Sequence, residues 1–307
     1  MEPRKPLDAH ASSIMLVLCM TWGLQQVLIK ATAGDMAPIL QIGLRSGVAA
    51  LLVGLLMLWQ REPGMDWAGT WRPGLVAGGL FSFEYLLVGE GMRFTTASHM
   101  AVFLYTAPIF VALGLHWRFP SERLSPVKWL GIGVAFTGIV VTFTGRTAPA
   151  VGGGQNMLLG DLLGLLAGAS WGATTVVLRS TNLSRAPAAQ TLLYQLVAAF
   201  VLLVLAAMGL GQLAVHGTPL LWGSLAFQAV GVSFVSFLVW FWLLRRYLAS
   251  PLSVFSFLTP LFGMAFGVWL LNEPLEASFL AGAALVLAGV LLVSSDGWLQ
   301  QWRQRMG

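Results

Sequence analysis

Charge is the scarcest property of this 307-residue chain. Only 9% of its residues are charged, against about 25% in a typical soluble domain, whereas 57% are hydrophobic. The sequence pI is about 9.9, but the basic residues are scattered in short connectors and form no patch, which argues against nucleic-acid binding. The composition therefore excludes an ordinary soluble protein and predicts one that lies in a lipid bilayer.

Signals for catalysis and for cofactors are also scarce. The single cysteine, Cys19, excludes an intramolecular disulfide, and the sequence contains no phosphate-binding loop, metal-ligand cluster or ATP-binding domain. Residues 168–172 fit the G-x-S-x-G pattern of serine hydrolases, but they lie inside a predicted helix and not at a strand-to-helix turn. We therefore expect no enzymatic activity, no cofactor and no metal site.

Long apolar runs fill most of the chain. A run of about 18 to 22 residues is long enough to cross a hydrocarbon core as a helix. Five such runs lie in the first half, at 11–31, 38–59, 73–92, 97–117 and 126–144. Five more lie in the second half, at 158–178, 188–208, 221–243, 250–271 and 276–294. The pattern predicts an all-α integral membrane protein with ten transmembrane helices.

The second half of the sequence repeats the first. Thr21-Trp22-Gly23 returns 149 residues later as Ser170-Trp171-Gly172. Further matches occur at spacings of 151 or 152 residues and pair Met92–Ser98 with Leu244–Ser250, Pro108 with Pro260, Glu122 with Glu273, Gly131 with Gly282, and Gly138 with Gly289. A nearly constant spacing along a whole half indicates duplication. It predicts two five-helix repeats, residues 1–148 and 149–307.

The lysines and arginines predict the direction of each helix, because cytoplasmic connectors are enriched in them. The two termini and the even-numbered connectors carry 13 of these residues, whereas the odd-numbered connectors carry only Lys30, Arg93 and Arg146. Both termini are therefore expected in the cytoplasm. Because each repeat has an odd number of helices, the second repeat enters the membrane inverted. Inverted repeats are typical of alternating-access transporters.

Few ionisable residues lie inside the predicted spans, where a charge needs a partner, water or a function. Arg45 and Glu84 lie deep in spans two and three, and His99 lies nearer the outer end of span four. Arg45 and Glu84 together match the two charges of a zwitterion. The alternative is an internal ion pair that holds two helices together. Glu84 is also a candidate proton-binding group.

Aromatic residues form a second candidate cluster. Trp22 and Trp171 occupy equivalent positions in spans one and six, beside glycines that would let a ligand approach the backbone. Other side chains that would line the same space are Tyr85, Tyr105, Tyr194, Gln195, Phe237 and Trp240. With Arg45, Glu84 and His99, they make up the predicted substrate-binding set. The alternative for the aromatic members is ordinary helix packing.

Two prolines lie at matching depths in the two repeats. Pro108 falls in span four and Pro260 in span nine. A proline inside a span bends the helix or acts as a hinge during a conformational change. The sequence leaves both interpretations open, and both residues are hinge candidates.

The order of these short elements resembles the drug/metabolite transporter superfamily, in particular its ten-helix EamA branch of bacterial exporters. The resemblance covers almost the whole chain and is carried by Trp22-Gly23, Trp171-Gly172, Pro38, Arg45, Ala107-Pro108, Glu122-Arg123-Leu124, Thr259-Pro260 and Asn272-Glu273-Pro274-Leu275. It implies ten helices, cytoplasmic termini, a central cavity and export of small metabolites. Relatives that carry highly anionic cargo use several basic cavity residues, whereas only Arg45 is deeply placed here.

Within that family, the aromatic-rich spans look most like the aromatic amino acid and paraquat exporters. The expected function is export of aromatic and other neutral amino acids across a bacterial inner membrane. The alternative is a broad exporter of drugs, non-aromatic amino acids or other metabolites. The expected partners are a small-molecule substrate and the lipid bilayer, with no nucleic acid, and the expected state is a monomer or a weak oligomer.

Overall fold

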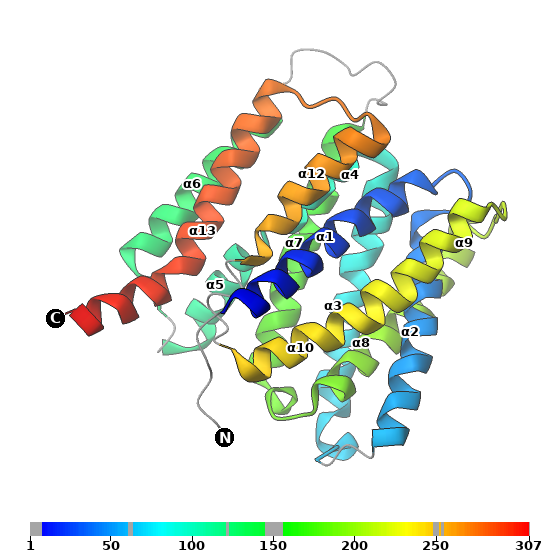
Figure 1. The fold of residues 1–307 in the computed structure, drawn as a ribbon, viewed down its shortest axis with the longest axis horizontal. Coiled ribbons are helices and arrows are strands. Elements are labelled where there is room, and N and C mark those ends of the chain that lie inside the picture. Colours follow the sequence, from blue (N-terminus) through cyan, green and yellow to red (C-terminus); the bar gives the residue numbers. More distant parts are fainter. Residues whose placement is uncertain are drawn as a thin grey trace.

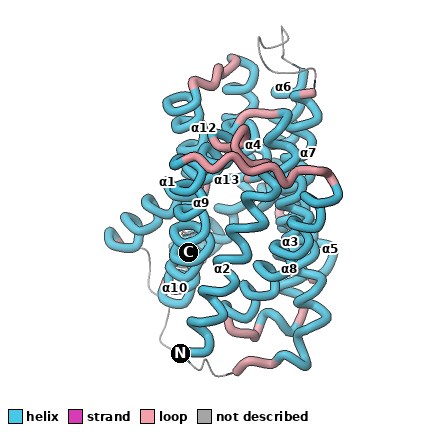
Figure 2. Tube along the Cα trace, turned by 90° about the vertical axis from the view of Figure 1, so that its right-hand side faces the viewer, coloured by secondary structure: helices cyan, strands magenta, loops and turns pink. Residues whose placement is uncertain are grey.

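The computed structural model describes residues 8–60, 64–120, 123–144, 156–247, 252 and 255–306. Within these ranges the regular structure is helical, apart from one isolated antiparallel bridge between Met36 and Val215. Figure 2 shows these helices joined by short loops. The sequence prediction of an all-α fold is confirmed. Glu122, the predicted repeat partner of Glu273, and the predicted boundary between the repeats at 148–149 lie outside the described residues.

The helices follow the predicted segments closely (Figure 1). The first half contains α1 (Ala9–Ala31), α2 (Pro38–Gln60), α3 (Trp67–Phe94), α4 (Ala97–Leu104), α5 (Ala107–Arg118) and α6 (Pro126–Thr144). The second half contains α7 (Met157–Ser180), the short 3-10 helix η2 (Asn182–Ser184), α8 (Ala188–Gly209), α9 (Pro219–Ala226), the π-helix η3 (Phe227–Ser236), α10 (Phe237–Arg246), α12 (Leu258–Leu271) and α13 (Ala277–Met306).

Within the part of the chain that the structure describes, seven helical segments are long and apolar enough to cross a membrane by length and composition. They are Ala9–Ala31, Pro38–Trp59, Trp67–Phe94, Ala97–Arg118, Met157–Ser180, Ala188–Gly209 and Pro219–Trp240. Three shorter apolar helices, Pro126–Thr142, Leu258–Leu271 and Ala277–Val293, coincide with the remaining predicted segments. The protein is therefore a multi-pass membrane protein.

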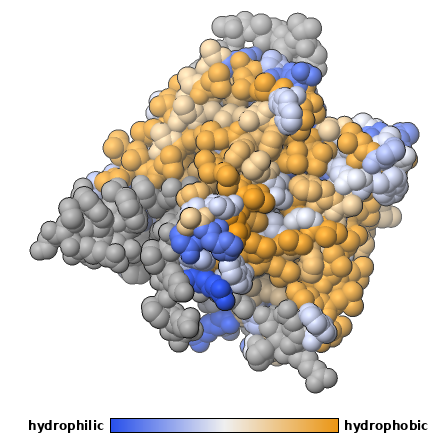
Figure 3. Space-filling view, in the orientation of Figure 1, coloured by the Kyte–Doolittle hydropathy of each residue, from blue (hydrophilic) through white to orange (hydrophobic). Residues whose placement is uncertain are grey.

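The outer surface of the bundle is suited to lipid. Apolar residues cover most of the described surface on the face seen in Figure 3. Around the molecule, large apolar side chains stand out from the helices, among them Leu58, Trp59, Trp117 and Trp269, each at least three-quarters exposed. Such a surface is stable against hydrocarbon chains and not against water.

Two predicted hinge prolines lie in the first turns of helices. Between α4 and α5 the regular helix is interrupted at Tyr105 and Thr106, and Pro108 follows in the first turn of α5. Pro260 likewise lies in the first turn of α12, which begins at Leu258. A proline in the first turn costs no hydrogen bond, because the amides there have no partner within the helix. The break explains why both prolines are tolerated, and their role as hinges stays a prediction.

Glycines bring repeat-equivalent helices into close contact. α6 and α13 lie side by side at one edge of the bundle (Figure 1), where a Cβ added to Gly131 would lie 2.7 Å from the carbonyl oxygen of Gly289. A Cβ on Gly138 would lie 2.6 Å from the carbonyl oxygen of Gly282. Gly282 and Gly138 are the repeat equivalents of Gly131 and Gly289, so the two contacts are equivalent under the repeat symmetry.

The same relationship recurs near the middle of the bundle. Gly23 of α1 abuts Phe262 and Gly263 of α12, and Gly172 of α7 abuts Phe110 and Val111 of α5. Phe262 and Gly263 follow Phe110 and Val111 by 152 residues, the spacing of Pro108 and Pro260. Each half therefore packs its Trp-Gly helix against the proline-bearing helix of the other half.

Candidate functional site

A cavity of about 740 Å³ lies among α1, α3, α7, α8 and α10. Its volume is within the range of small-molecule binding sites. Eight of the eleven predicted substrate-binding residues line it: Trp22, Glu84, Tyr85, Tyr105, Trp171, Gln195, Phe237 and Trp240. The sequence thus predicted about a third of the residues that line the cavity.

Aromatic rings form the apolar part of the wall. Trp22 meets Trp240 edge to face with ring centroids 5.7 Å apart, and Tyr105 meets Trp171 in the same way at 5.3 Å. Edge-to-face contacts hold such rings in defined orientations. The indole Nε1 of Trp22 also donates a 2.8 Å hydrogen bond to the hydroxyl of Ser236 at the end of η3. The aromatic wall is therefore rigid on the Trp22 side.

Glu84 is the acidic group of the cavity. Its side chain is only 4% exposed, and its Oε2 atom is buried without a hydrogen-bond partner among the described residues. Gln25 and Gln26 of α1 line the same space. A buried carboxylate oxygen without a partner is unfavourable, and a ligand that brings a positive charge or an N–H donor relieves that cost.

Arg45 does not line the cavity, so the structure does not bring it together with the other predicted binding residues. Its guanidinium lies over the Tyr85 ring, 4.9 Å from the centroid, and Nη1 donates to Gln228 Oε1 at 3.3 Å. No ion pair within 4.0 Å joins the described side chains of Arg45 and Glu84, so the predicted internal ion pair is also not formed. Arg45 therefore contacts a residue of the cavity wall, Tyr85, from outside the cavity.

Tyr194 is also not among the residues that line the cavity. Its ring packs edge to face on Trp67 at 5.5 Å, and its hydroxyl lies 3.2 Å from the Thr70 hydroxyl. Neighbouring side chains on an α-helix point about 100° apart, so α8 directs Gln195 to the cavity and Tyr194 to α3. The sequence did not predict that these two adjacent side chains of α8 point toward different neighbours.

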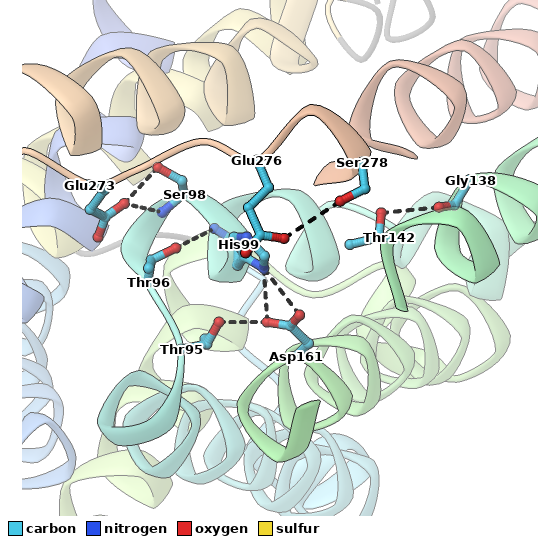
Figure 4. A network of polar contacts seen from close by, with 10 residues as sticks. All are labelled: Thr95, Thr96, Ser98, His99, Gly138, Thr142, Asp161, Glu273, Glu276 and Ser278. Carbon is cyan, nitrogen blue, oxygen red and sulfur yellow. Dashed lines mark hydrogen bonds and ion pairs between the residues drawn. The ribbon is translucent and has the colours of Figure 1, made fainter. Parts of the chain in front are cut away.

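His99 does not line the cavity either and belongs to a separate polar network (Figure 4). Its Nδ1 lies 3.0 Å from Asp161 Oδ2, and its ring stacks on Phe279 at 3.7 Å. Thr95 donates to Asp161 Oδ1 at 2.5 Å. Both members of the His99–Asp161 pair are buried. The pair joins α4 of the first half to α7 of the second half.

Glu273 and Lys30 complete this network around the connection between α3 and α4. Glu273 accepts hydrogen bonds from the amides of Ala97 and Ser98 and from the Ser98 hydroxyl. Lys30 of α1 donates to the carbonyl oxygens of Met92 and Thr95. We define this set, together with His99 and Asp161, as the polar cluster. It closes the bundle at the end near residues 95–99.

The opposite end of the cavity reaches the connection between α7 and α8. Arg179, Leu183, Ser184, Ala186 and Ala188 line it there, and Arg179 and Ser184 are exposed. This connection is one of those enriched in arginine. The cavity therefore approaches one face of the bundle, and the polar cluster lies near the other.

Sequence reasoning missed Asp161 and the contact between Trp22 and Ser236. Asp161 was detectable as an acidic residue in the first turns of an otherwise apolar span, which is costly unless the group has a partner. Ser236 was not among the predicted site residues. Its hydrogen bond with a tryptophan 214 residues away depends on helix packing, which no local pattern reveals.

Known proteins resemble this chain over nearly its full length. A Bacillus subtilis protein named uncharacterized transporter YoaV is 25% identical and is matched over 91% of this chain and 94% of its own length. A Salmonella typhimurium protein named probable amino-acid metabolite efflux pump is 27% identical, over 91% of this chain and 93% of its own. A solved crystal structure shares the fold, with a TM-score of 0.65 and 19% identity, over 96% of this chain and 99% of that one.

A family profile covers both halves separately. The profile of the EamA-like transporter family matches residues 11–144 and again residues 158–295. Two matches of one profile in one chain agree with the duplication read from the sequence. The protein therefore belongs to the EamA-like transporter family, within the drug/metabolite transporter superfamily.

Proposed function

We propose that the protein exports amino acids and related small metabolites, aromatic amino acids among them, across the inner membrane of a bacterium. The observation that carries this proposal is an aromatic-walled cavity with an unpartnered carboxylate inside it. Relatives named as probable amino-acid metabolite efflux pumps, at 26 to 27% identity, support the same class of cargo.

In this proposal the ammonium group of an amino acid binds Glu84. A flat side chain lies against Trp22, Tyr105 and Trp171, and the amides of Gln25 and Gln195 bind polar groups. Charge-assisted hydrogen bonds to a buried carboxylate are stronger than neutral ones, so Glu84 contributes most to orientation. Arg45 fixes the Tyr85 ring beside it.

We further propose ten transmembrane helices in two inverted repeats, residues 1–148 and 149–307, with both termini in the cytoplasm. The distribution of lysine and arginine supports this topology. The crossed contacts of Gly131 with Gly289 and of Gly138 with Gly282 are those expected of a twofold relationship between the halves. In this orientation the cavity faces the cytoplasm and the polar cluster closes the periplasmic end.

A broader drug exporter is the second candidate. The same carboxylate and aromatic wall accommodate a lipophilic organic cation that has no carboxylate of its own, because a cation is attracted by both. The two candidates differ in whether the cargo must carry the α-carboxylate of an amino acid.

Flux into liposomes tests both candidates. Purified protein is reconstituted, and uptake of labelled Phe, Tyr, Trp, Met and Thr and of tetraphenylphosphonium is compared with uptake into empty liposomes, with and without a proton gradient. We expect saturable flux of the aromatic amino acids, with the cargo recovered chemically unchanged. Glu84→Gln is expected to reduce that flux at least tenfold, which corresponds to about 1.4 kcal/mol.

The matched control is Glu90→Gln. Glu90 lies on the same helix but pairs with Arg93 at 2.7 Å and does not line the cavity, so flux should change less than twofold. Flux of tetraphenylphosphonium alone would favour the drug exporter. Flux equal to that of empty liposomes for every compound would reject transport of both classes.

A further inference from the structure

Two interfaces in the bundle are repeat equivalents, yet they carry different hydrogen bonds. One joins α1 to η3, and the other joins α7 to α3. Trp22 corresponds to Trp171, and Ser236 corresponds to Glu84. At the first interface Trp22 Nε1 donates to Ser236 at 2.8 Å. At the second, Trp171 and Glu84 both line the cavity, and no hydrogen bond joins their described side chains.

The hydroxyl residues that directly precede the two tryptophans show the opposite pattern of hydrogen bonds. Ser170 donates across its interface to the carbonyl oxygen of Leu80 at 2.8 Å. Its equivalent, Thr21, donates within its own helix to Val17 at 2.8 Å. The carbonyl of Val232, the equivalent of Leu80, accepts from Ser236 instead, at 2.6 Å. At the interface of α1 with η3, Trp22 donates across the interface and Thr21 does not. At the interface of α7 with α3, Ser170 donates across the interface and Trp171 does not, among the described side chains.

We propose that these are the two settings of one switch and that they are exchanged when the transporter opens to the other side. In the outward-open state Trp171 Nε1 donates to the Glu84 carboxylate, and the Trp22–Ser236 hydrogen bond is broken. Exchange of conformation between inverted repeats is how such folds alternate access. The inference rests on the proposed function, in which Glu84 binds the cationic end of the cargo.

Glu84 then has two successive partners. In the conformation described here its Oε2 lacks a protein partner, so an ammonium group binds it. In the outward-open state the Trp171 N–H occupies the carboxylate, and the ammonium group is displaced. Because a ligand shifts an equilibrium only through its different affinity for the two states, this competition favours release on the outer side. Trp171 is thereby a positioning residue for cargo release as well as part of the cavity wall.

The repeat symmetry also identifies two positions whose accessibility can be measured without cargo. Leu178 lines the present cavity, and its repeat equivalent is Ile29. Ile29 is fully buried, in a cluster with Met36, Met92 and Met100. If the settings are exchanged, Ile29 becomes accessible from the outside as Leu178 becomes buried.

Cysteine labelling in oriented membrane vesicles measures this exchange. Leu178→Cys and Ile29→Cys are made separately in a Cys19→Ala background, since Cys19 is the only native cysteine. A membrane-impermeant maleimide is applied from the cytoplasmic or the periplasmic side, without cargo. Trp171→Phe keeps an aromatic ring but removes the N–H. It should lower periplasmic labelling at position 29 and raise cytoplasmic labelling at position 178, so that the ratio of the two labelling rates changes at least about tenfold, the factor expected for one hydrogen bond to a charged group.

Ser236→Ala removes the acceptor of Trp22 and should change both labelling rates in the opposite direction. Trp269→Phe, on the exposed surface of α12, is the matched control and should change neither. If Ile29→Cys does not fold, position 178 reports alone. Labelling unaffected by Trp171→Phe and by Ser236→Ala would overturn the switch. The labelling is measured without cargo, so it tests the switch independently of the proposed function. If labelling shifts as expected but the protein shows no amino acid flux, the proposed cargo is rejected and the switch is retained.

Discussion

Glu273 caps the first turn of α4 at Ser98. Its Oε2 accepts from the Ser98 amide at 3.0 Å and from the Ser98 hydroxyl at 2.6 Å, while Oε1 accepts from the neighbouring Ala97 amide at 2.7 Å. A carboxylate at a helix N-terminus satisfies free amides and interacts favourably with the helix dipole. The contact also joins the two halves of the chain at the end of the bundle away from the cavity mouth.

Replacing Glu273 should weaken that closure. Glu273→Gln keeps the shape but loses the charge, and we expect it to lower the free energy of unfolding by about 1 to 3 kcal/mol. Thermal melting of the detergent-solubilised protein measures the effect. Glu276→Gln is the control, because the side chain of Glu276, in the same connection, accepts a long 3.5 Å bond from Ser278 and caps no helix among the described residues. Equal melting temperatures for the two variants would contradict the capping role.

The buried pair of His99 and Asp161 gives a second prediction. Removing one member takes a buried hydrogen bond from the other, which typically costs about 1 to 3 kcal/mol. Asp161→Asn and His99→Gln should therefore each destabilise the protein strongly, and the double variant should lose less than the sum of the two. A double-mutant cycle in thermal melting checks this. Strict additivity would mean that the pair does not contribute to closing the bundle.

Arg45 is expected to act on transport through Tyr85. Arg45→Lys keeps the charge but loses the flat guanidinium that lies 4.9 Å from the ring centroid. The KM of amino acid flux should rise about threefold to tenfold, with maximal flux little changed. Arg72→Lys is the control, since Arg72 stacks on Trp71 outside the cavity. A change confined to maximal flux would count against a role in orienting Tyr85.

Asp8 makes the start of α1 sensitive to pH. Hydrogen bonds from the Ala11 amide and the Tyr247 hydroxyl lower the pKa of this carboxyl below its ordinary value of 3.8. A lowered pKa stabilises the folded state above the ordinary value, and that contribution is lost as pH falls through the folded pKa. Asp8→Ala should therefore lower the melting temperature at pH 7. The difference should shrink steadily as the pH falls below about 4.

The sequence predicted helix positions better than side-chain directions. Apolar run lengths and breaks such as Gly34-Asp35 depend on local composition, so all predicted segments contain an apolar helix. Repeat symmetry found Trp22 and Trp171, because equivalent residues of a duplicated fold meet equivalent surroundings. Arg45 and Tyr194 lie outside the cavity wall that was predicted for them, because a deep position in a span does not determine which neighbouring helix a side chain faces. That choice depends on helix rotation, which is set by packing between distant segments.

The contact between α6 and α13 leads to the last prediction. A Cβ on Gly138 would lie 2.6 Å from the carbonyl oxygen of Gly282 and 2.7 Å from the amide of Val286. Both are backbone atoms, so the clash is relieved only if the helices separate, and Gly138→Ala should lower the melting temperature markedly. Gly133→Ala is the matched control on the same helix, because no atom lies within 4 Å of its added Cβ. It should stabilise α6 by up to about 1 kcal/mol, since alanine is the better helix former. Opposite shifts of the two melting temperatures are therefore expected, and a common direction would show that helix propensity, not close contact, decides stability at this edge.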